Sequence, residues 1–323
     1  MKKIIVATLT AASLVALPVS AQQVLRLSHN AAAGNPKADA SLLFAKLVEE
    51  KTDGRIKVEV GGSAQYGDDL ESLTNMRLGT LAFSANSQGT TSTVVPQFAV
   101  IGLPFMFRDL DHAYAVVDGP AGDKLSELAR EKGLEVLAFW DNGIRHVSNN
   151  KRPIVEPADL AGIKLRTPPD PMTMDIFSAL GANPMSLAFS ELYIALQQGV
   201  VDGQENPFMN IYSSKLHEVQ KYISLTGHKY ETTPVLASKI VFDRFSDEDK
   251  KLIKEAAIEA GAFNRQKSRE ADENLRATFL AAGVEINDIN RDAFVAKMQP
   301  VYDKWSGQYP ELVELVRSEA ERL

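Results

Sequence analysis

The chain has 323 residues and no cysteine, so disulfides, thiolate metal sites and a cysteine nucleophile are all excluded. Histidine is also scarce, and the five residues at positions 29, 112, 146, 217 and 228 match no compact metal-binding signature. Basic residues are in deficit, because 35 Lys and Arg stand against 42 Asp and Glu, for a formal net charge of −7. A protein that follows a phosphate backbone needs a basic face. We therefore expect no metal, no cofactor and no nucleic acid partner.

The common catalytic motifs are absent as well. The sequence contains no G-x-S-x-G, no Walker A loop, no G-x-G-x-x-G and no H-E-x-x-H. The adjacent carboxylates Asp68 and Asp69 stand at a predicted helix start, where the helix dipole already accounts for them. Nothing in the residues requires catalysis, so we predict no catalytic group.

Long apolar runs are confined to the N-terminus. Lys2 and Lys3 precede an apolar stretch from Ile4 to Val19, and small residues up to Ala21 form a cleavage site, so residues 1–21 are predicted to be a secretory signal peptide. The stretch is too short and too interrupted for a membrane anchor, and no later segment reaches the roughly 18 apolar residues that a spanning helix needs. We expect an exported chain that is released from the membrane.

The first half of the remaining chain alternates between strand and helix patterns. Strands are predicted at 24–28, 56–60, 81–85 and 134–140, and helices at 36–51, 68–78 and 121–132. This order predicts an α/β fold with a mostly parallel sheet and helices on both of its faces.

A second unit of the same kind begins near Arg145. Strands are predicted around 163–166 and 230–241, and helices after Pro171, at 190–198, at 210–218 and from 246 to about 282. The length, with 45% hydrophobic residues, is enough for two lobes with separate cores. No flexible linker separates them, so the chain is expected to cross more than once. The expected lobe I comprises 22–143 plus about 231–270, and lobe II comprises 144–230 plus about 271–323, including the C-terminal helices.

The segment from Gly162 to Pro168 predicts a short strand that ends in an arginine. Apolar and basic residues alternate up to Arg166, and two prolines then stop the strand. In open α/β sheets, ligands bind at the C-terminal ends of strands, and a guanidinium group matches a carboxylate with two hydrogen bonds. A surface arginine or a salt-bridged one is the alternative, and one residue alone does not decide between them.

Further polar residues follow other predicted strands. His29 and Asn30 follow the first strand, Asn86 follows the third, and the residues from Trp140 to Arg145 follow the fourth. Each fits ordinary turn chemistry as well as a ligand site. Asn206 differs, because Pro207 forces it toward an extended backbone and makes it a pre-shaped donor.

Three motifs in order carry a family resemblance. They are Gly162-Ile-Lys-Leu-Arg166, Ser190-Glu-Leu-Tyr-Ile-Ala-Leu-Gln-Gln198 and Gly199-Val-Val-Asp-Gly-Gln-Glu-Asn-Pro207. Together they resemble the substrate-binding subunits of tripartite ATP-independent periplasmic (TRAP) transporters. The likeness extends to Pro36–Gly54, Gln65–Asp69 and Ile101–Phe105. It implies an α/β periplasmic binding protein with two discontinuous lobes (type II) and a long helix that bridges them.

The resemblance also implies a carboxylate site. Arg166 resembles the arginine that makes the main salt bridge to the ligand, Arg145 a second arginine at the same carboxylate, and Asn206 the amide that completes this site. Phe189 matches an aromatic residue that lines the cleft. Two guanidinium groups and an amide satisfy both oxygens of a carboxylate that is removed from water.

The first lobe is expected to contact the rest of the ligand. It offers Asn30, His29, Glu71 and Asn86, which are donors and acceptors rather than further cations. Where some sialic acid-binding members carry an acid and an arginine, this chain has Ser87 and Thr90, which disfavours that ligand. The first-choice ligand is a hexuronate such as glucuronate or galacturonate. Another sugar acid, a small hydroxy acid or a C4-dicarboxylate is the alternative.

A secreted lyase that acts on sugar acids is the rival class. It would need a titratable base near the bound carboxylate, and only His29 and Glu71 are candidates. The resemblance instead implies a monomeric binding protein in the periplasm, without enzymatic activity. Such a protein closes over an organic acid and delivers it to a membrane permease driven by a sodium gradient.

Overall fold

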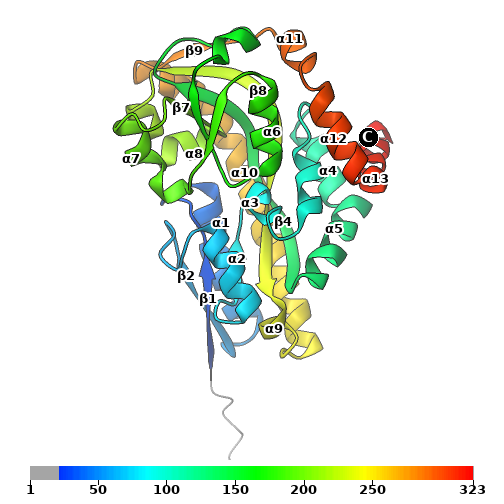
Figure 1. Cartoon of the computed structure of the whole chain (residues 1–323). Helices are drawn as coiled ribbons and strands as arrows, with labels where there is room; N and C mark the ends of the chain where they lie inside the picture. Colours follow the sequence, from blue (N-terminus) through cyan, green and yellow to red (C-terminus); the bar gives the residue numbers. More distant parts are fainter. Residues whose placement is uncertain (1–21, 323) are drawn as a thin grey trace, which may run out of the picture.

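The computed structural model describes residues 22–322, so the predicted signal peptide at 1–21 lies outside the described residues. Within the described range, no helix combines the length and the apolar character needed to cross a bilayer. These residues form an α/β structure around one sheet of nine strands (Figure 1). The predicted fold class is confirmed, because strands and helices alternate through both halves of the molecule.

The strand order is β2-β1-β3-β8-β4-β7-β5-β6, with β9 beside β8. The strands are β1 (Gln23–Ser28), β2 (Ile56–Gly61), β3 (Phe83–Ala85), β4 (Leu134–Asn149), β5 (Lys164–Thr167), β6 (Asn183–Ser186), β7 (Gly203–Asn206), β8 (Tyr222–Ser238) and β9 (Glu285–Asn287). Pairing is parallel between β1 and its two neighbours and between β5 and its two neighbours. Where β8 and β4 join the two halves, pairing is antiparallel. The mostly parallel sheet that we predicted therefore exists within each half but not at the centre.

The two longest strands, β4 and β8, run through both halves. The residues from Trp140 to Arg145 lie inside β4, so the prediction that they follow a strand is wrong. Their pairing with β8 continues through register shifts between Asp141 and Gly143 and between Arg145 and Val147, and such bulges bend a strand without ending it. The expected lobe boundaries at 143/144 and 230/231 fall in this region. We propose that the lobes join there.

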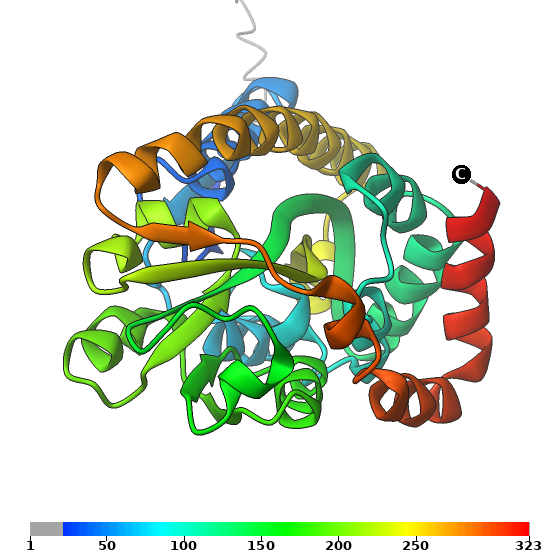
Figure 2. The ribbon, with the colours of Figure 1, turned by 90° about the horizontal axis from the view of Figure 1, so that it is seen from above.

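The helices cover both faces of the sheet (Figure 2). The α-helices are α1 (Pro36–Lys51), α2 (Asp69–Leu78), α3 (Gln88–Thr91), α4 (Leu110–Val117), α5 (Pro120–Glu131), α6 (Pro171–Ala179), α7 (Leu192–Gln197), α8 (Phe208–Ser213), α9 (Lys239–Phe242), α10 (Asp247–Ala281), α11 (Arg291–Val295), α12 (Gln299–Gln308) and α13 (Pro310–Arg322). Four 3-10 helices complete the set: η1 (Pro96–Gly102), η2 (Pro157–Leu160), η3 (Phe189–Glu191) and η4 (Leu216–Glu218). In α1 and α2, the side chains of Asn35 and Asp68 cap the N-terminus.

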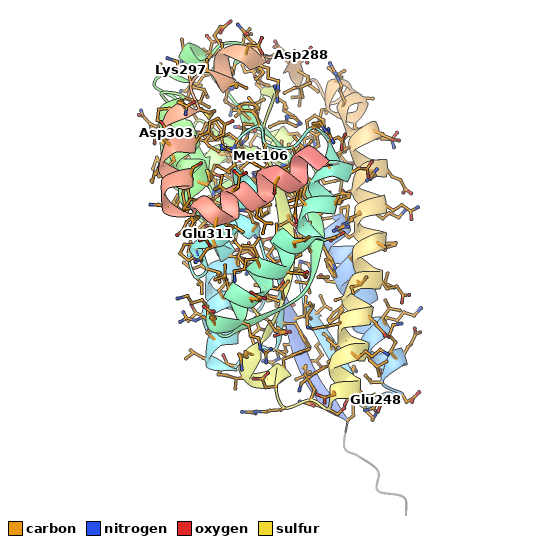
Figure 3. The ribbon with its side chains drawn as sticks, turned by 90° about the vertical axis from the view of Figure 1, so that its right-hand side faces the viewer. Met106, Glu248, Asp288, Lys297, Asp303 and Glu311 are labelled. Atoms are coloured by element: carbon orange, nitrogen blue, oxygen red, sulfur yellow. The ribbon has the colours of Figure 1, made fainter. Side chains whose placement is uncertain are left out.

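The 35-residue helix α10 bridges the two halves, as the resemblance implied. It begins at the cap Ser246, whose hydroxyl accepts a hydrogen bond from the backbone N–H of Asp249, and three acids follow in its first turn. It packs against α1 in one half and against α8 in the other. Figure 3 shows α10 along most of the height of the molecule, with α13 lying across α4 and α5. This helix packs against both halves on the side of the molecule opposite β5 and β6.

Separate apolar cores stabilise the two halves. Phe44 of α1 packs edge-on against Phe83 of β3, with 5.5 Å between ring centroids, and Phe208 packs against Phe279 at 5.4 Å in the other half. A third and larger core runs through both halves, because it joins Leu73 of α2 to Ile176 of α6 and to Val316 of α13. Each half thus has a core of its own, and a shared core connects the two.

Candidate functional site

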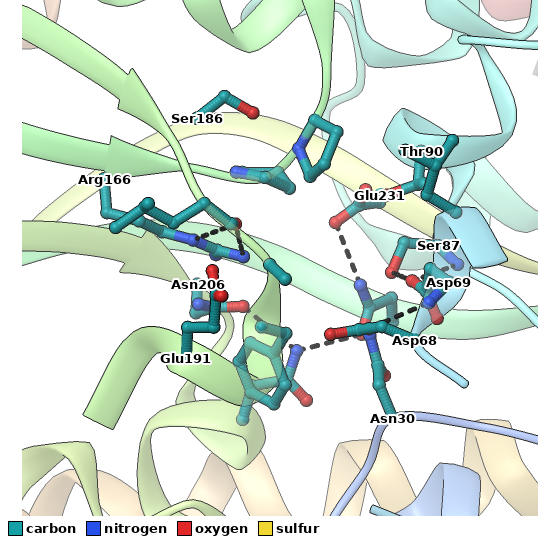
Figure 4. Close-up of a pocket in the computed structure, with 18 of the residues that line it drawn as sticks. Asn30, Asp68, Asp69, Ser87, Thr90, Arg166, Ser186, Glu191, Asn206 and Glu231 are labelled. Carbon is teal, nitrogen blue, oxygen red and sulfur yellow. Dashed lines mark hydrogen bonds between the residues drawn. The ribbon is translucent and has the colours of Figure 1, made fainter. Parts of the chain in front are cut away.

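A pocket of about 310 Å³ lies between the two halves of the sheet (Figure 4). This volume is typical of small-molecule sites. The helix starts of α1 and α2 form one wall, the ends of β5 and β7 form the other, and β4 and β8 form the floor. The lining residues are Asn30, Lys37, Asp68, Asp69, Leu70, Ser87, Thr90, Asn142, Arg145, Arg166, Pro168, Pro169, Ser186, Leu187, Ala188, Phe189, Glu191, Asn206, Asn210 and Glu231.

Arg166 stands near the end of β5, as predicted, and contributes a buried cation to the pocket wall. It is 1% exposed, and its Nε and Nη2 donate to the carbonyl oxygen of Leu187 at 3.0 and 2.8 Å. The ring of Phe189 lies 5.7 Å from its Cζ. Within residues 22–319, Arg166 takes part in no ion pair, and burial lowers its pKa to about 10. No carboxylate of this range therefore compensates its charge.

Arg145 also lines the pocket, but its charge is already compensated by the protein. Its Nε donates to Glu205 at 2.5 Å, its Nη2 donates to the other carboxylate oxygen at 2.7 Å, and its Nη1 donates to Glu231. All three side chains are buried. Burial opposes the charge of Arg145, yet the two carboxylates outweigh it and raise its pKa. These contacts leave only part of Nη1 for a ligand.

Asn206 and His228 belong to the same buried network. The amide of Asn206 donates to Gln204 at 2.5 Å, and its oxygen accepts from Arg145 at 3.2 Å. His228 Nε2 lies 3.1 Å from Glu205, and burial lowers the pKa of this imidazole although Glu205 acts in the opposite direction. The network surrounds the guanidinium of Arg145 at the floor of the pocket.

On the opposite wall, Asp69 is a buried acid at the start of α2. It is 5% exposed, and its Oδ2 accepts from the hydroxyl of Ser87 at 2.5 Å and from its backbone N–H at 3.1 Å. Burial raises the pKa of Asp69 to about 6. The helix dipole, which we used to explain Asp68 and Asp69, accounts for only part of their role. Both also line the pocket.

Lys37, in the first turn of α1, is a cation that the sequence analysis missed. It is 3% exposed and lines the pocket, and no carboxylate of the described range lies within 4.0 Å of its ammonium. Burial lowers its pKa, although Asp69 and Glu231 act in the opposite direction. A lysine in the first helical turn is disfavoured by the helix dipole, and that conflict is the signal that points to a special role.

Five of the eight predicted site residues line the pocket: Arg166, Arg145, Asn206, Phe189 and Asn30. The other three, His29, Glu71 and Asn86, are absent from its lining. His29 is buried beside Gly62, and burial lowers its pKa to about 4. Glu71 is exposed, and buried Asn86 donates to the backbone carbonyl of Asp69 at 2.9 Å. Neither candidate base for a lyase is therefore part of the pocket wall.

Local geometry explains the positions of His29 and Glu71. Adjacent residues of an extended chain point to opposite sides, so Asn30 faces the pocket and His29 faces inward. Positions two apart on a helix do not share a face, which separates Glu71 from Asp69. Among residues 22–319, no group of three acidic or histidine side chains has the arrangement of a metal site.

Two sets of hydrogen bonds connect the walls across the pocket mouth. Asp68 Oδ2 accepts from the hydroxyl of Ser190 at 2.7 Å and from its backbone N–H at 3.2 Å. Asn35 Nδ2 donates to Asn210 at 2.9 Å and to Ser213 at 3.2 Å. The structure therefore has its two halves in direct contact around the pocket.

A sheet divided into two halves, a helix that spans both, and an unpaired arginine in the pocket between them define a two-lobed ligand-binding protein. A family model described as bacterial extracellular solute-binding protein, family 7 (DctP), matches residues 27–308. The chain belongs to this family. The match confirms the predicted resemblance to TRAP substrate-binding subunits and the prediction of a binding protein rather than an enzyme.

Individual relatives do not identify the ligand. The uncharacterized protein y4mM of Sinorhizobium fredii is 50% identical over 86% of this chain, which spans about half (51%) of that relative. A TRAP periplasmic solute binding protein from Roseobacter denitrificans with bound β-D-glucuronate has a TM-score of 0.88 and 33% identity, covering 92% of this chain and 99% of that one. One from Sulfurospirillum deleyianum with bound succinate has a TM-score of 0.87 and 34% identity, with the same coverage. Because equally similar proteins bind different acids, the ligand has to be inferred from the pocket.

Proposed function

We propose that this protein captures a hexuronate, such as glucuronate or galacturonate, and delivers it to the membrane permease of a TRAP transporter. It acts as a monomer in the periplasm, after removal of residues 1–21. The observation that carries the proposal is the unpaired, buried guanidinium of Arg166 in the wall of the pocket. A carboxylate with two oxygens in one plane matches the fork of an arginine, and it supplies the counter-charge that the protein lacks there.

The charges around the pocket favour an acid with one carboxylate. Arg145 is compensated by Glu205 and Glu231, whereas Arg166 and Lys37 form no ion pair with the side chains of residues 22–319. Lys37 is the one feature that favours a C4-dicarboxylate. A second carboxylate next to Lys37, however, would also face Asp69, and like charges repel strongly in a buried site. Hydroxyl groups can donate to that acid instead, so a polyhydroxylated monoacid fits better.

The order of ligand-induced shifts in melting temperature tests this assignment. We expect D-glucuronate and D-galacturonate to raise the melting temperature more than succinate or malate at equal concentration, because stabilisation follows RT ln(1 + [L]/Kd). D-glucose, which lacks the carboxylate, is the matched control and should give no shift. A larger shift with succinate would reverse the ranking. The absence of a shift with every acid would overturn the proposed function.

Ligand binding is also expected to close the two lobes. The ligand is anchored on one lobe by Arg166, and the bonds from Asp68 to Ser190 and from Asn35 to Asn210 form only when the lobes meet. Turning a mostly open population into a mostly closed one requires a preference of about 10⁴-fold for the closed state, or about 5.5 kcal/mol. Small-angle scattering should therefore show a smaller radius of gyration with saturating glucuronate than without it. An unchanged radius would mean that the pocket is closed before the ligand arrives.

A further inference from the structure

We propose that Lys37 and Asp69 form a second subsite, which binds a hydroxyl group at the end of the ligand remote from its carboxylate. In this chain the pair selects hydroxylated acids, because Lys37 alone would also accept a carboxylate. The inference rests on the proposed function, because it assumes that Arg166 holds the carboxylate. The inference goes beyond the proposed function by naming the chemical group of the ligand that the wall opposite Arg166 recognises.

The side chain of Lys37 is almost entirely buried, and its ammonium group, which lines the pocket, has no acceptor among residues 22–319. Only the backbone of this residue forms hydrogen bonds in the part of the chain that the structure describes: its N–H donates to Asn35 Oδ1 at 2.9 Å, and its carbonyl accepts from Ser41. An ammonium group has three donors, and leaving them unsatisfied after burial is costly. Because the side chain lines the pocket, a bound molecule can supply the missing acceptor.

Asp69 provides the complementary acceptor. Its Oδ2 is occupied by Ser87, while its Oδ1 accepts none of the hydrogen bonds found within residues 22–322. The charge of this carboxylate is the one that most favours the protonated form of Lys37, so the two groups act on the same part of the pocket. This wall therefore offers donors and an acceptor together.

A hydroxyl is the functional group that satisfies both partners, because it accepts and donates hydrogen bonds and carries no charge. A carboxylate would satisfy Lys37 but would meet the charge of Asp69. An ammonium group would satisfy Asp69 but would meet Lys37. The pair therefore distinguishes a hydroxylated monoacid from both a dicarboxylate and an amino acid.

The two subsites lie on opposite sides of the pocket. Figure 4 shows Arg166 with Asn206 on one side, and Asp69 with Ser87 and Glu231 on the other. A ligand that reaches both must carry its hydroxyl several carbons away from its carboxylate. Sugar acids of five or six carbons have this form.

Calorimetric titration with D-glucuronate tests the role of Lys37. Lys37→Met keeps the length and the apolar stem of the side chain, and it should weaken binding about 10-fold to 100-fold, the usual range for hydrogen bonds to a charged group. Lys46→Met, on the same helix but with its side chain 68% exposed, is the matched control and should stay within about threefold of wild type. Lys37→Met removes an uncompensated buried charge, so it should not lower the melting temperature of the unliganded protein. A lowered melting temperature would instead indicate a structural role for Lys37.

A second variant, Asp69→Asn, tests the hydroxyl assignment. We expect its affinity for D-glucuronate to fall and its affinity for succinate to stay constant or rise, because the repulsion of a second carboxylate is removed. An equal loss for both acids would overturn the assignment of a hydroxyl. If wild type binds glucuronate and Lys37→Met binds it within threefold, the inference fails while the proposed function stands. If wild type binds neither acid, the proposed function itself fails.

Discussion

Replacing Arg166 with alanine is expected to weaken binding of D-glucuronate by roughly 30-fold to several thousand-fold, while the protein stays folded. Removing one partner of a desolvated charge pair costs about 2 to 5 kcal/mol, and the ligand carboxylate would then enter a buried wall without its counter-charge. Arg166→Lys should restore only part of the affinity, because an ammonium group lacks the planar fork that matches two carboxylate oxygens. Titration calorimetry measures both variants.

The unliganded Arg166→Ala protein should stay folded, with a loss of stability limited to the two hydrogen bonds to the carbonyl oxygen of Leu187 and the contact with Phe189. Burial already lowers the pKa of Arg166, which means that its charge is held in the protein against a desolvation penalty. Its removal leaves no acid without a partner. Lys164→Ala, an exposed position on the same strand, is the control for any general effect on β5. An Arg166→Ala affinity within a factor of about three of wild type would contradict the assignment of this residue as the carboxylate anchor.

Replacing Arg145 with alanine is expected to have the opposite consequence, a loss of about 3 to 5 kcal/mol in the free energy of unfolding. Glu205 and Glu231 would remain buried without the cation that now binds both of them. Urea denaturation of the unliganded protein measures the loss. Arg166→Ala is the matched comparison, because it removes the same side chain from the same pocket without stranding a carboxylate.

The outcome for Arg145→Ala separates the roles of the two arginines. If its unfolding free energy stays within about 1 kcal/mol of wild type, the ion-pair network does not hold the pocket floor. If Arg166→Ala is instead the less stable variant, our distinction between a compensated and an uncompensated arginine is wrong. Adding Glu231→Gln to Arg145→Ala should recover part of the stability, because one of the stranded charges is then removed.

Local sequence patterns predicted the elements whose stability comes from neighbouring residues. The predicted bounds of α10 are accurate because Ser246 caps the first turn and Gly283 follows the end in a left-handed conformation (φ +84°). The position of Arg166 near the end of a strand is predicted for the same reason. The alternation of apolar and basic residues indicates the strand, and the prolines at 168 and 169 end it, so both signals come from neighbouring residues. By contrast, β4 continues past Trp140 because β8, far along the chain, pairs with its polar residues.

The sequence by itself therefore determined the fold class, the family and the position of Arg166 near the end of a strand. Only the tertiary structure decided which of the two arginines, Arg145 or Arg166, has a carboxylate partner within the protein. Glu205 and Glu231 come from β7 and β8 and neutralise Arg145, whereas no carboxylate of the described chain reaches Arg166 or Lys37. The physical reason is the distance along the sequence over which each interaction acts. Helix caps and hydrophobic periodicity depend on neighbouring residues. The charge state of a buried side chain depends on groups far along the chain that the fold brings into contact with it.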